Sequence, residues 1–179
     1  MEPHIFDDQA MIQNLIFDLD DTLLDTSRIL IPIANTSAFE ARIKQKLDLM
    51  PGALENLQLL HRRYKLYLLT IGRTHFQKQK IASLAIDGFY HRIDIIDSSQ
   101  GHSKMPLFRQ ICADSGAPPG TFLSIGNRRS MDIREAKMVQ MQTCLFRYGE
   151  YSDEKAEVAA DFPDFEVNHH QELIAKCGL

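Results

Sequence analysis

The sequence predicts one α/β domain built around a doubly wound parallel sheet. Short apolar runs of strand length alternate along the chain with segments in which apolar residues follow the helical period, and this alternation is typical of βα units. The chain has 179 residues, of which 44% are hydrophobic, so it can bury a sizeable core. Because no repeat, low-complexity tract or linker divides it, we expect a single domain over residues 1–179.

Five apolar runs are predicted to be the strands of this sheet. Together with its flanking residues, each run has the length of a strand, and each is bounded by polar or turn-forming residues. A short edge strand and a closing helix are the weaker expectations for residues 161–167 and 171–177. The five strands are residues 15–17, 66–69, 93–96, 122–125 and 143–146.

Four segments between these runs carry apolar stripes at helical spacing and are predicted to be the crossover helices. Pro51 and Gly52 open the first of them, and the stretch 116–120, with its two prolines, ends the third. The stripes are Leu54, Leu57 and Leu60; Phe76, Lys80, Ile81 and Leu84; Phe108, Ile111, Cys112 and Ser115; and Ile133, Ala136, Lys137 and Gln140.

Residues 25–50 form the one insertion that does not fit this alternation. The stretch from Ser37 to Glu40 fits a capping box, and Phe39, Ile43, Leu47 and Met50 follow helical spacing, so we expect one helix at most. Its apolar face is expected to pack on the core of the same chain, with docking on a second subunit, in a homodimer, as the alternative.

Charge and composition exclude several classes of function. Twenty basic and 24 acidic residues give a net charge of −4, which shows no footprint for nucleic acid or an anionic membrane. No apolar stretch is long enough to span a bilayer, and residues 1–8 lack the features of a secretion signal, so we expect a cytoplasmic protein. The three cysteines are widely spaced, which predicts reduced thiols and neither disulfides nor a zinc knuckle.

The most informative motif follows the first predicted strand, where Asp18, Asp20 and Thr22 form the pattern DxDxT. Side chains two residues apart in a strand share a face, and parallel sheets place their ligands at the carboxyl edge. Both carboxylates are therefore predicted to project into one crevice. There Asp18 could attack phosphorus and Asp20 could handle the protons. The alternative is that these aspartates only decorate a strand-to-loop turn.

Three later segments supply what such a reaction lacks. Thr70 ends the second strand, where its hydroxyl and the amides of Ile71 and Gly72 could bind phosphate oxygens. Lys104 precedes a predicted helix and could place a positive charge on the phosphate and the nucleophile. The segment from Gly126 to Asp132 follows the fourth strand. Taken alone, these residues also fit a strand-end Thr, a solvated Lys, an ordinary turn and a helix N-cap.

Together these motifs resemble the haloacid dehalogenase-like (HAD) hydrolase superfamily over about residues 14–146. The resemblance implies a Rossmannoid fold, a nucleophilic Asp18, an acid/base Asp20 and a minimal or absent cap, because residues 25–50 are too short for a helical bundle. Asn127 departs from the pattern, since the family usually has an acid there. The matching residues are Asp18, Asp20, Thr70, Lys104 and Asp132.

The negative charge of two carboxylates and a phosphate requires a bridging cation, and Mg²⁺ is the expected cofactor. Mg²⁺ prefers an octahedron of oxygens, which Asp18, the backbone carbonyl of Asp20, Asn127 and Asp132 could supply in part. Because the amide of Asn127 is neutral, we expect weaker metal binding than with an aspartate.

The sequence therefore predicts Mg²⁺-dependent hydrolysis of a small phosphorylated metabolite through a phosphorylated Asp18. The alternative is a catalytically weak HAD-like domain that binds a phosphorylated ligand or a protein partner. A phosphomutase would use the same residues but generally needs a cap to exclude water. Neither GxSxG, HExxH nor a Walker A loop occurs. The motif fixes the phosphate end of the substrate and leaves the leaving group open.

Overall fold

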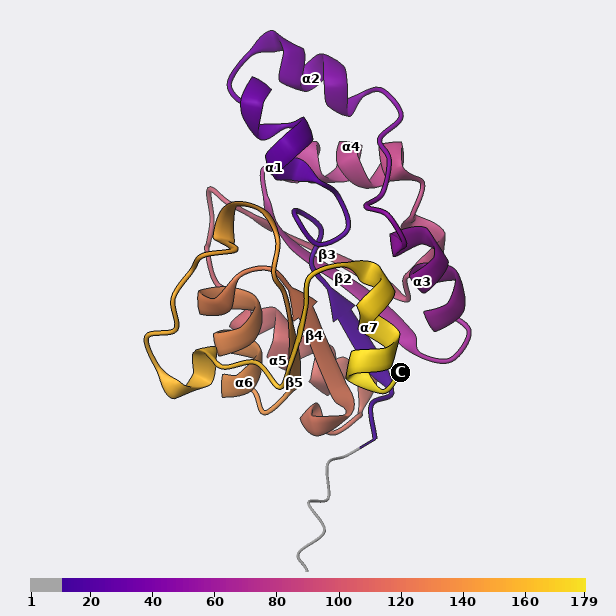
Figure 1. Ribbon diagram of the computed structural model, residues 1–179, viewed down its shortest axis with the longest axis vertical. Helices are drawn as coiled ribbons and strands as arrows, with labels where there is room; N and C mark the ends of the chain where they lie inside the picture. The colour runs from indigo at the N-terminus through magenta and orange to yellow at the C-terminus, as the bar shows by residue number, and fades with distance from the viewer. Residues whose placement is uncertain (1–10) are drawn as a thin grey trace, which may run out of the picture.

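The computed structural model describes residues 11–179, so the predicted absence of a secretion signal at residues 1–8 lies outside it. The described chain folds around a six-stranded parallel sheet with the strand order β3-β2-β1-β4-β5-β6 (Figure 1). The five predicted strands and the weaker edge strand are confirmed. Their bounds are β1 Asn14–Phe17, β2 Lys65–Gly72, β3 Arg92–Asp97, β4 Phe122–Gly126, β5 Gln142–Phe146 and β6 Phe165–Val167.

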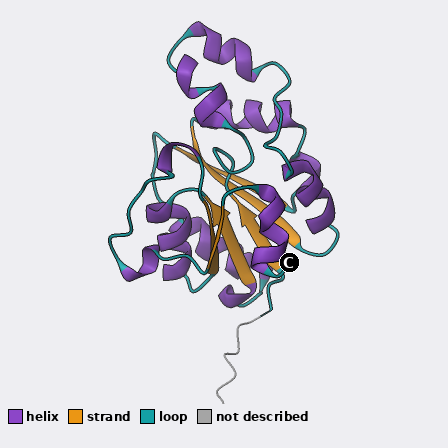
Figure 2. Cartoon of the chain, in the orientation of Figure 1, coloured by secondary structure: helices purple, strands orange, loops and turns teal. Residues whose placement is uncertain are grey.

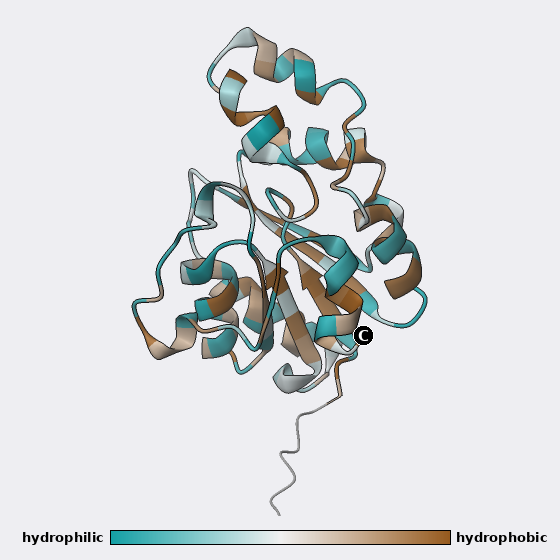
Figure 3. Cartoon of the chain, in the orientation of Figure 1, coloured by the Kyte–Doolittle hydropathy of each residue, from teal (hydrophilic) through white to brown (hydrophobic). Residues whose placement is uncertain are grey.

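Helices cover both faces of the sheet, so the doubly wound architecture is confirmed (Figure 2). The strands are largely apolar, whereas the helices combine polar and apolar residues (Figure 3). All four predicted crossover helices and the closing helix are present. The helices are α1 Thr26–Ile29, α2 Ser37–Ile43, α3 Ala53–Leu60, α4 Thr74–Leu84, α5 Met105–Ser115, α6 Arg134–Met138 and α7 His170–Cys177.

Alternation along the strands divides the core into two clusters. Leu15 and Phe17 of β1 point to the face covered by α3 and α7, while Ile16 points to the face covered by α5 and α6. Glycines mark two of the helix ends that the sequence predicts. Gly52 before α3 and Gly116 after α5 both have positive φ, of 83° and 68°, a region that glycine enters without steric cost.

The chain enters α6 differently from the prediction. A π-helical turn, Arg129–Ile133, precedes this helix, and α6 itself ends at Met138, before the end of the predicted stripe. A carboxylate oxygen of Asp132 accepts a hydrogen bond from the backbone N–H of Arg128, which winds this turn tightly beneath the end of β4.

The insertion of residues 25–50 holds two short helices, α1 and α2, with a 3-10 turn at Ile31–Ile33 between them, so the expectation of one helix at most was wrong. The capping box was wrong as well, because Ser37 is already the first helical residue. The apolar face of α2 packs on α4 of the same chain: Phe39 meets the ring of Phe76 at 5.0 Å, and Ser83 donates to the carbonyl of Ile43.

Two composition-based expectations can be compared with the structure. The three cysteines are buried and form no disulfide bonds in the described chain, which confirms the prediction of free thiols. Among the described helices, none is long and apolar enough to cross a membrane.

Candidate active site

The carboxyl ends of the central strands form a pocket of about 260 Å³. Asp18 follows β1 at the centre of the sheet, and its backbone N–H donates to the carbonyl of Ile125 at 2.9 Å, which extends the ladder between β1 and β4. Of the eight residues that the sequence proposes for the site, Gly72 alone lies outside the pocket wall. The seven that line it are Asp18, Asp20, Thr70, Ile71, Lys104, Asn127 and Asp132.

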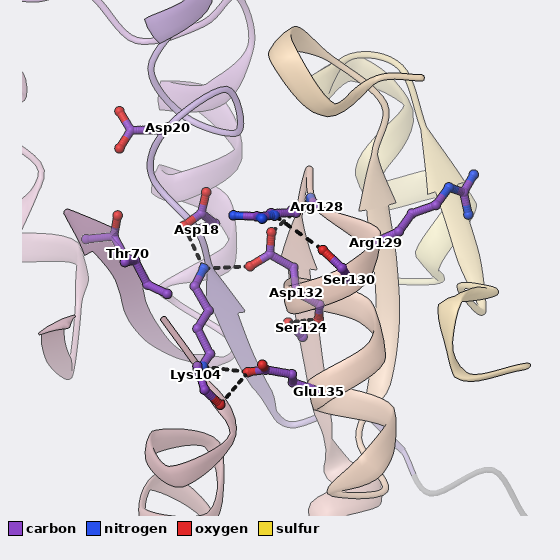
Figure 4. A network of polar contacts seen from close by, with 12 residues as sticks. Asp18, Asp20, Thr70, Lys104, Ser124, Arg128, Arg129, Ser130, Asp132 and Glu135 are labelled. Carbon is purple, nitrogen blue, oxygen red and sulfur yellow. Dashed lines mark hydrogen bonds and ion pairs between the residues drawn. The ribbon is translucent and has the colours of Figure 1, made fainter. Parts of the chain in front are cut away.

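Lys104 joins the nucleophile candidate to the last motif (Figure 4). Its Nζ lies 2.7 Å from Oδ1 of Asp18 and 2.5 Å from Oδ1 of Asp132, and its side chain is 3% exposed. Burial by itself lowers the pKa of Lys104, but the two carboxylates outweigh burial and raise it above the ordinary value. The amine is therefore a fixed positive charge beside Asp18.

The carboxylate of Asp18 is buried among other charged groups. Burial, opposed by Lys104 and assisted by the charges of Asp132 and Asp20, raises the pKa of Asp18 to about 7. Lys104 occupies Oδ1, and within the described chain no donor bonds to Oδ2. One oxygen of Asp18 is thus held while the other is open to the pocket.

Asp20 has different neighbours, none of which the sequence analysis identified as functional. Its Oδ1 accepts from Nζ of Lys80 at 2.6 Å and from the hydroxyl of Thr26 at 2.5 Å, and its Oδ2 accepts from Nε2 of Gln77 at 2.8 Å. Burial alone raises the pKa of Asp20, but Lys80 and these hydrogen bonds lower it below the ordinary value. A lysine inside the predicted buried stripe of α4 was the signal that could have identified Lys80.

The expected phosphate-binding segment at the end of β2 is partly occupied. Nε2 of Gln77 donates to the hydroxyl oxygen of Thr70 at 2.7 Å and lies 3.2 Å from the carbonyl oxygen of Ile71. Gly72 packs against the same glutamine, where a Cβ would approach Cδ of Gln77 to 2.8 Å. Thr70 can still donate its hydroxyl proton to a ligand. Gly72, by lacking a side chain, leaves room for the side chain of Gln77.

Gly126 allows the last motif to close on itself. A Cβ at this position would lie 2.3 Å from Cγ of Asp132, so no larger residue fits above that carboxylate. Both carboxylate oxygens of Asp132 are engaged, one by Lys104 and the other by the backbone N–H of Arg128 at 3.0 Å. This geometry favours Asp132 as the partner of Lys104 over its predicted role as a metal ligand.

Asn127 is oriented toward a role as an oxygen donor. A carbonyl only accepts, so the amide nitrogen Nδ2 of Asn127 faces the carbonyl oxygen of Tyr148, to which it donates at 3.2 Å. The amide oxygen Oδ1 points the other way and has no hydrogen bond within the described chain. The described residues contain no group of three His, Cys, Asp or Glu side chains that could hold a metal ion. The available donors are therefore the carboxylate of Asp18, the carbonyl of Asp20 and the amide of Asn127, a set of hard oxygens that fits Mg²⁺.

Two further residues support the site from outside the predicted set. Glu135 of α6 caps the start of α5: its Oε2 accepts from the backbone N–H groups of Lys104 and Met105 at 2.5 and 2.8 Å. Both ends of Lys104, its backbone by Glu135 and its amine by Asp132, are thus held by one stretch of chain (Figure 4).

His170 of α7 supports the DxDxT loop from the opposite end of the chain. Its Nδ1 faces Nδ2 of Asn56 at 3.3 Å and so acts as the acceptor, while Nε2–H donates to the carbonyl of Thr22 at 2.7 Å. The ring packs against Phe146 at 4.8 Å, and burial lowers the pKa of His170, which favours the neutral ring.

Comparisons of the sequence with known proteins identify similar phosphatases. No family model matches the chain. A protein from Methanopyrus kandleri named glyceraldehyde 3-phosphate phosphatase is 30% identical over 135 residues, which are 75% of this chain and 57% of that protein. A protein of the same name from Pyrococcus furiosus is 24% identical over 222 residues, with 91% of this chain and 92% of the relative covered.

Solved structures show the same fold. A haloacid dehalogenase-like hydrolase from Streptococcus pneumoniae matches with a TM-score of 0.73 at 19% identity, covering 92% of this chain and 97% of that one. A predicted phosphoglycolate phosphatase from Haemophilus somnus matches with a TM-score of 0.75 at 15% identity over 93% and 98% of the two chains. A HAD hydrolase from Bacillus subtilis, solved with magnesium bound, matches with a TM-score of 0.69 at 17% identity and the same coverage. The chain therefore has the fold of the haloacid dehalogenase-like hydrolases, and the curated relatives that it resembles in sequence are named as phosphatases.

Proposed function

We propose that the chain hydrolyses a small phosphomonoester through a phosphorylated Asp18, with Mg²⁺ as its cofactor. The observation that carries this proposal is the arrangement around Asp18, whose Oδ1 is held by Lys104 while Oδ2 is open to a small pocket. A carboxylate held in this way presents a lone pair to an incoming phosphorus atom, and the adjacent amine offsets the charge of the phosphoryl group.

The residues divide the reaction between them. Oδ2 of Asp18 forms a bond to phosphorus as the bond to the ester oxygen breaks, and a protonated Asp20 gives its proton to the leaving alkoxide. Asp20 then takes a proton from the water that attacks the phosphorus of phospho-Asp18, which restores the carboxylate of Asp18 and releases phosphate. Asp18, the carbonyl of Asp20 and Asn127 would hold Mg²⁺, which when bound offsets the negative charge shared by the carboxylate and the phosphoryl group.

The ion pair of Asp20 favours one second candidate, a domain that binds a phosphorylated ligand with little turnover. Lys80 and Gln77 occupy the carboxylate that must exchange protons, and Asn127 supplies no charge to the metal. Binding of phosphorylated ligands without hydrolysis of any of them would favour this second candidate.

The decisive experiment compares the parent protein with Asp18→Asn, which keeps the shape but removes the nucleophile. We expect the parent with Mg²⁺ to hydrolyse an aryl phosphate and Asp18→Asn to lose about four orders of magnitude or more in kcat. Glyceraldehyde 3-phosphate is the first natural substrate to test, because the named relatives act on it. Equal activity in the variant would contradict the mechanism, and beryllium fluoride should form a stable complex with the parent alone.

Asn127 offers a separate test of the metal. Replacing its neutral oxygen by a carboxylate in Asn127→Asp should tighten Mg²⁺ binding by about 1–3 kcal/mol, measured by calorimetric titration. Unchanged or weaker binding would show that residue 127 is not a ligand.

A further inference from the structure

The pocket wall contains three cationic side chains, and two of them already have carboxylate partners. Lys104 is paired with Asp18 and Asp132, and Lys80 is paired with Asp20. The third is Arg128, which makes no ion pair with any carboxylate of the described chain. An arginine that lines a pocket of acidic residues without a partner of its own is suited to an anion from outside.

Arg128 is held in position by its surroundings. Its guanidinium lies 4.4 Å from the centre of the Tyr151 ring, and its Nε donates to the hydroxyl of Ser130 at 3.3 Å. Its backbone N–H is fixed by Asp132. These contacts leave terminal N–H groups of the guanidinium without hydrogen bonds in the described structure, so a planar anion could be bound with little loss of side-chain freedom.

The two other acidic residues of this wall do not pair with Arg128. The carboxylate of Asp21 accepts from the backbone N–H and hydroxyl of Ser27 and from the N–H of Glu150, and Glu150 itself is exposed.

Position within the sheet separates Arg128 from the expected phosphate-binding segment. Thr70 lies near the carboxyl end of β2 on one side of β1, whereas Arg128 and Tyr151 follow β4 and β5 on the other side. Asp18 accordingly lies between Thr70 and Arg128 (Figure 4). A substrate whose phosphoryl group lies on Asp18 beside Thr70 and Lys104 can reach Arg128 with a different group.

From this arrangement we infer that Arg128 selects substrates that carry a carboxylate besides the phosphate, that is, small phosphorylated hydroxy acids. The inference rests on the proposed phosphatase function. The pocket volume of about 260 Å³ lies below the range of about 300–1,000 Å³ typical of pockets for drug-sized ligands, which agrees with a substrate of few atoms. From the insertion of residues 25–50, Thr26 and Ile31 line the pocket, and neither carries a charge.

The test compares kcat/KM for 2-phosphoglycolate with that for 2-hydroxyethyl phosphate, which has similar size but no carboxylate. The parent should prefer 2-phosphoglycolate, and Arg128→Gln should reduce this preference by about 10- to 100-fold while leaving hydrolysis of 2-hydroxyethyl phosphate within about threefold. Arg128→Lys should recover part of the preference, because it keeps the charge but loses the planar fork. A parent without this preference, or an Arg128→Gln variant that loses both activities equally, would overturn the inference.

Arg129→Gln is the matched control. Its guanidinium points away from the pocket toward Glu166, at 3.3 Å, so the substrate preference should not change (Figure 4). Loss of the preference in this variant as well would also overturn the assignment to Arg128.

Failure of the proposed function is distinguishable from failure of this inference. If the parent hydrolyses neither compound, calorimetry with Mg²⁺ measures binding of the same two compounds to the parent and to Arg128→Gln. Tighter binding of 2-phosphoglycolate that depends on Arg128 would support the inference for a binding domain, and equal binding of the two compounds would refute it.

Discussion

Asp18 and Asp20 are two residues apart in the sequence, yet their surroundings give their carboxylates opposite properties. Burial raises the pKa of Asp18 to about 7 although Lys104 is adjacent. Burial also acts on Asp20, but there Lys80, Thr26 and Gln77 lower the pKa. The comparison shows that the spacing in DxDxT fixes where the carboxylates lie, while distant segments of the chain decide how readily each one binds a proton.

The two partner lysines also differ in how they are shared. Lys104 lies between two carboxylates, so its removal raises the pKa of Asp18 further and leaves the buried Asp132 without a cationic partner. Lys80 serves Asp20 alone, and the Asp20 side chain is 28% exposed, so water can replace part of that interaction. Substitutions in the two clusters should therefore differ in size.

Lys104→Met is expected to have the largest effect on stability. Breaking a buried pair leaves an uncompensated charge, and the free energy of unfolding should fall by about 3–5 kcal/mol in urea titrations at pH 7. Adding Asp132→Asn to this variant should restore part of the loss, because the buried carboxylate that lost its partner is gone. Lys78→Met, at an exposed position of α4, is the control. A loss no larger than in that control would show that Lys104 does not balance the two carboxylates.

Lys80→Met should have an intermediate effect of about 1–3 kcal/mol at pH 7. The folded pKa of Asp20 lies below its unfolded value, so this interaction stabilises the protein above the unfolded pKa and is lost as pH falls through the folded pKa. The stability difference between parent and variant should therefore shrink toward zero in acid, below about pH 4. A difference that stays constant with pH would exclude Lys80 as the cause of the lowered pKa.

The same substitution also sharpens the functional comparison. Removing Lys80 raises the pKa of Asp20, so the limb of the pH–rate profile that Asp20 sets should move to higher pH, on the alkaline side where Asp20 acts as the acid and on the acid side where it acts as the base. Gln79→Met, at the half-buried position that directly precedes Lys80 on α4, should not shift the profile.

Glu135→Gln should have the smallest effect. The amide oxygen can still accept from the start of α5, but it loses the charge that favours a helix N-terminus, so we expect a loss of about 0.5–1 kcal/mol in stability. If Glu135 positions Lys104, kcat should fall more than KM changes, and Glu135→Ala should be worse than Glu135→Gln. A variant with normal kcat and lower stability would show that Glu135 only caps the start of α5 and does not position Lys104 for catalysis.

The sequence predicted the parts of the site that depend on local pattern. Asp18, Thr70 and Asn127 each follow an apolar run, and because parallel strands share a carboxyl edge, these residues meet. Lys80, Gln77 and Glu135 lie inside helices, where their reach depends on how each helix is rotated against the sheet. Helix α1 escaped prediction for a different reason: it has only four residues and is capped by Asp25, so it shows no apolar period.

The hydrogen bond between His170 and Thr22 can form only late in synthesis of the chain, although it supports a loop near the N-terminus. The two residues are separated by 148 positions, so at roughly 5–20 residues per second the ribosome adds His170 roughly 7–30 s after Thr22. Until α7 emerges and docks, the carbonyl of Thr22 lacks its donor and the loop that carries Asp20 has no support from this side. We therefore expect the nascent chain to position its acid/base residue Asp20 late, after all six strands of the sheet have been synthesised.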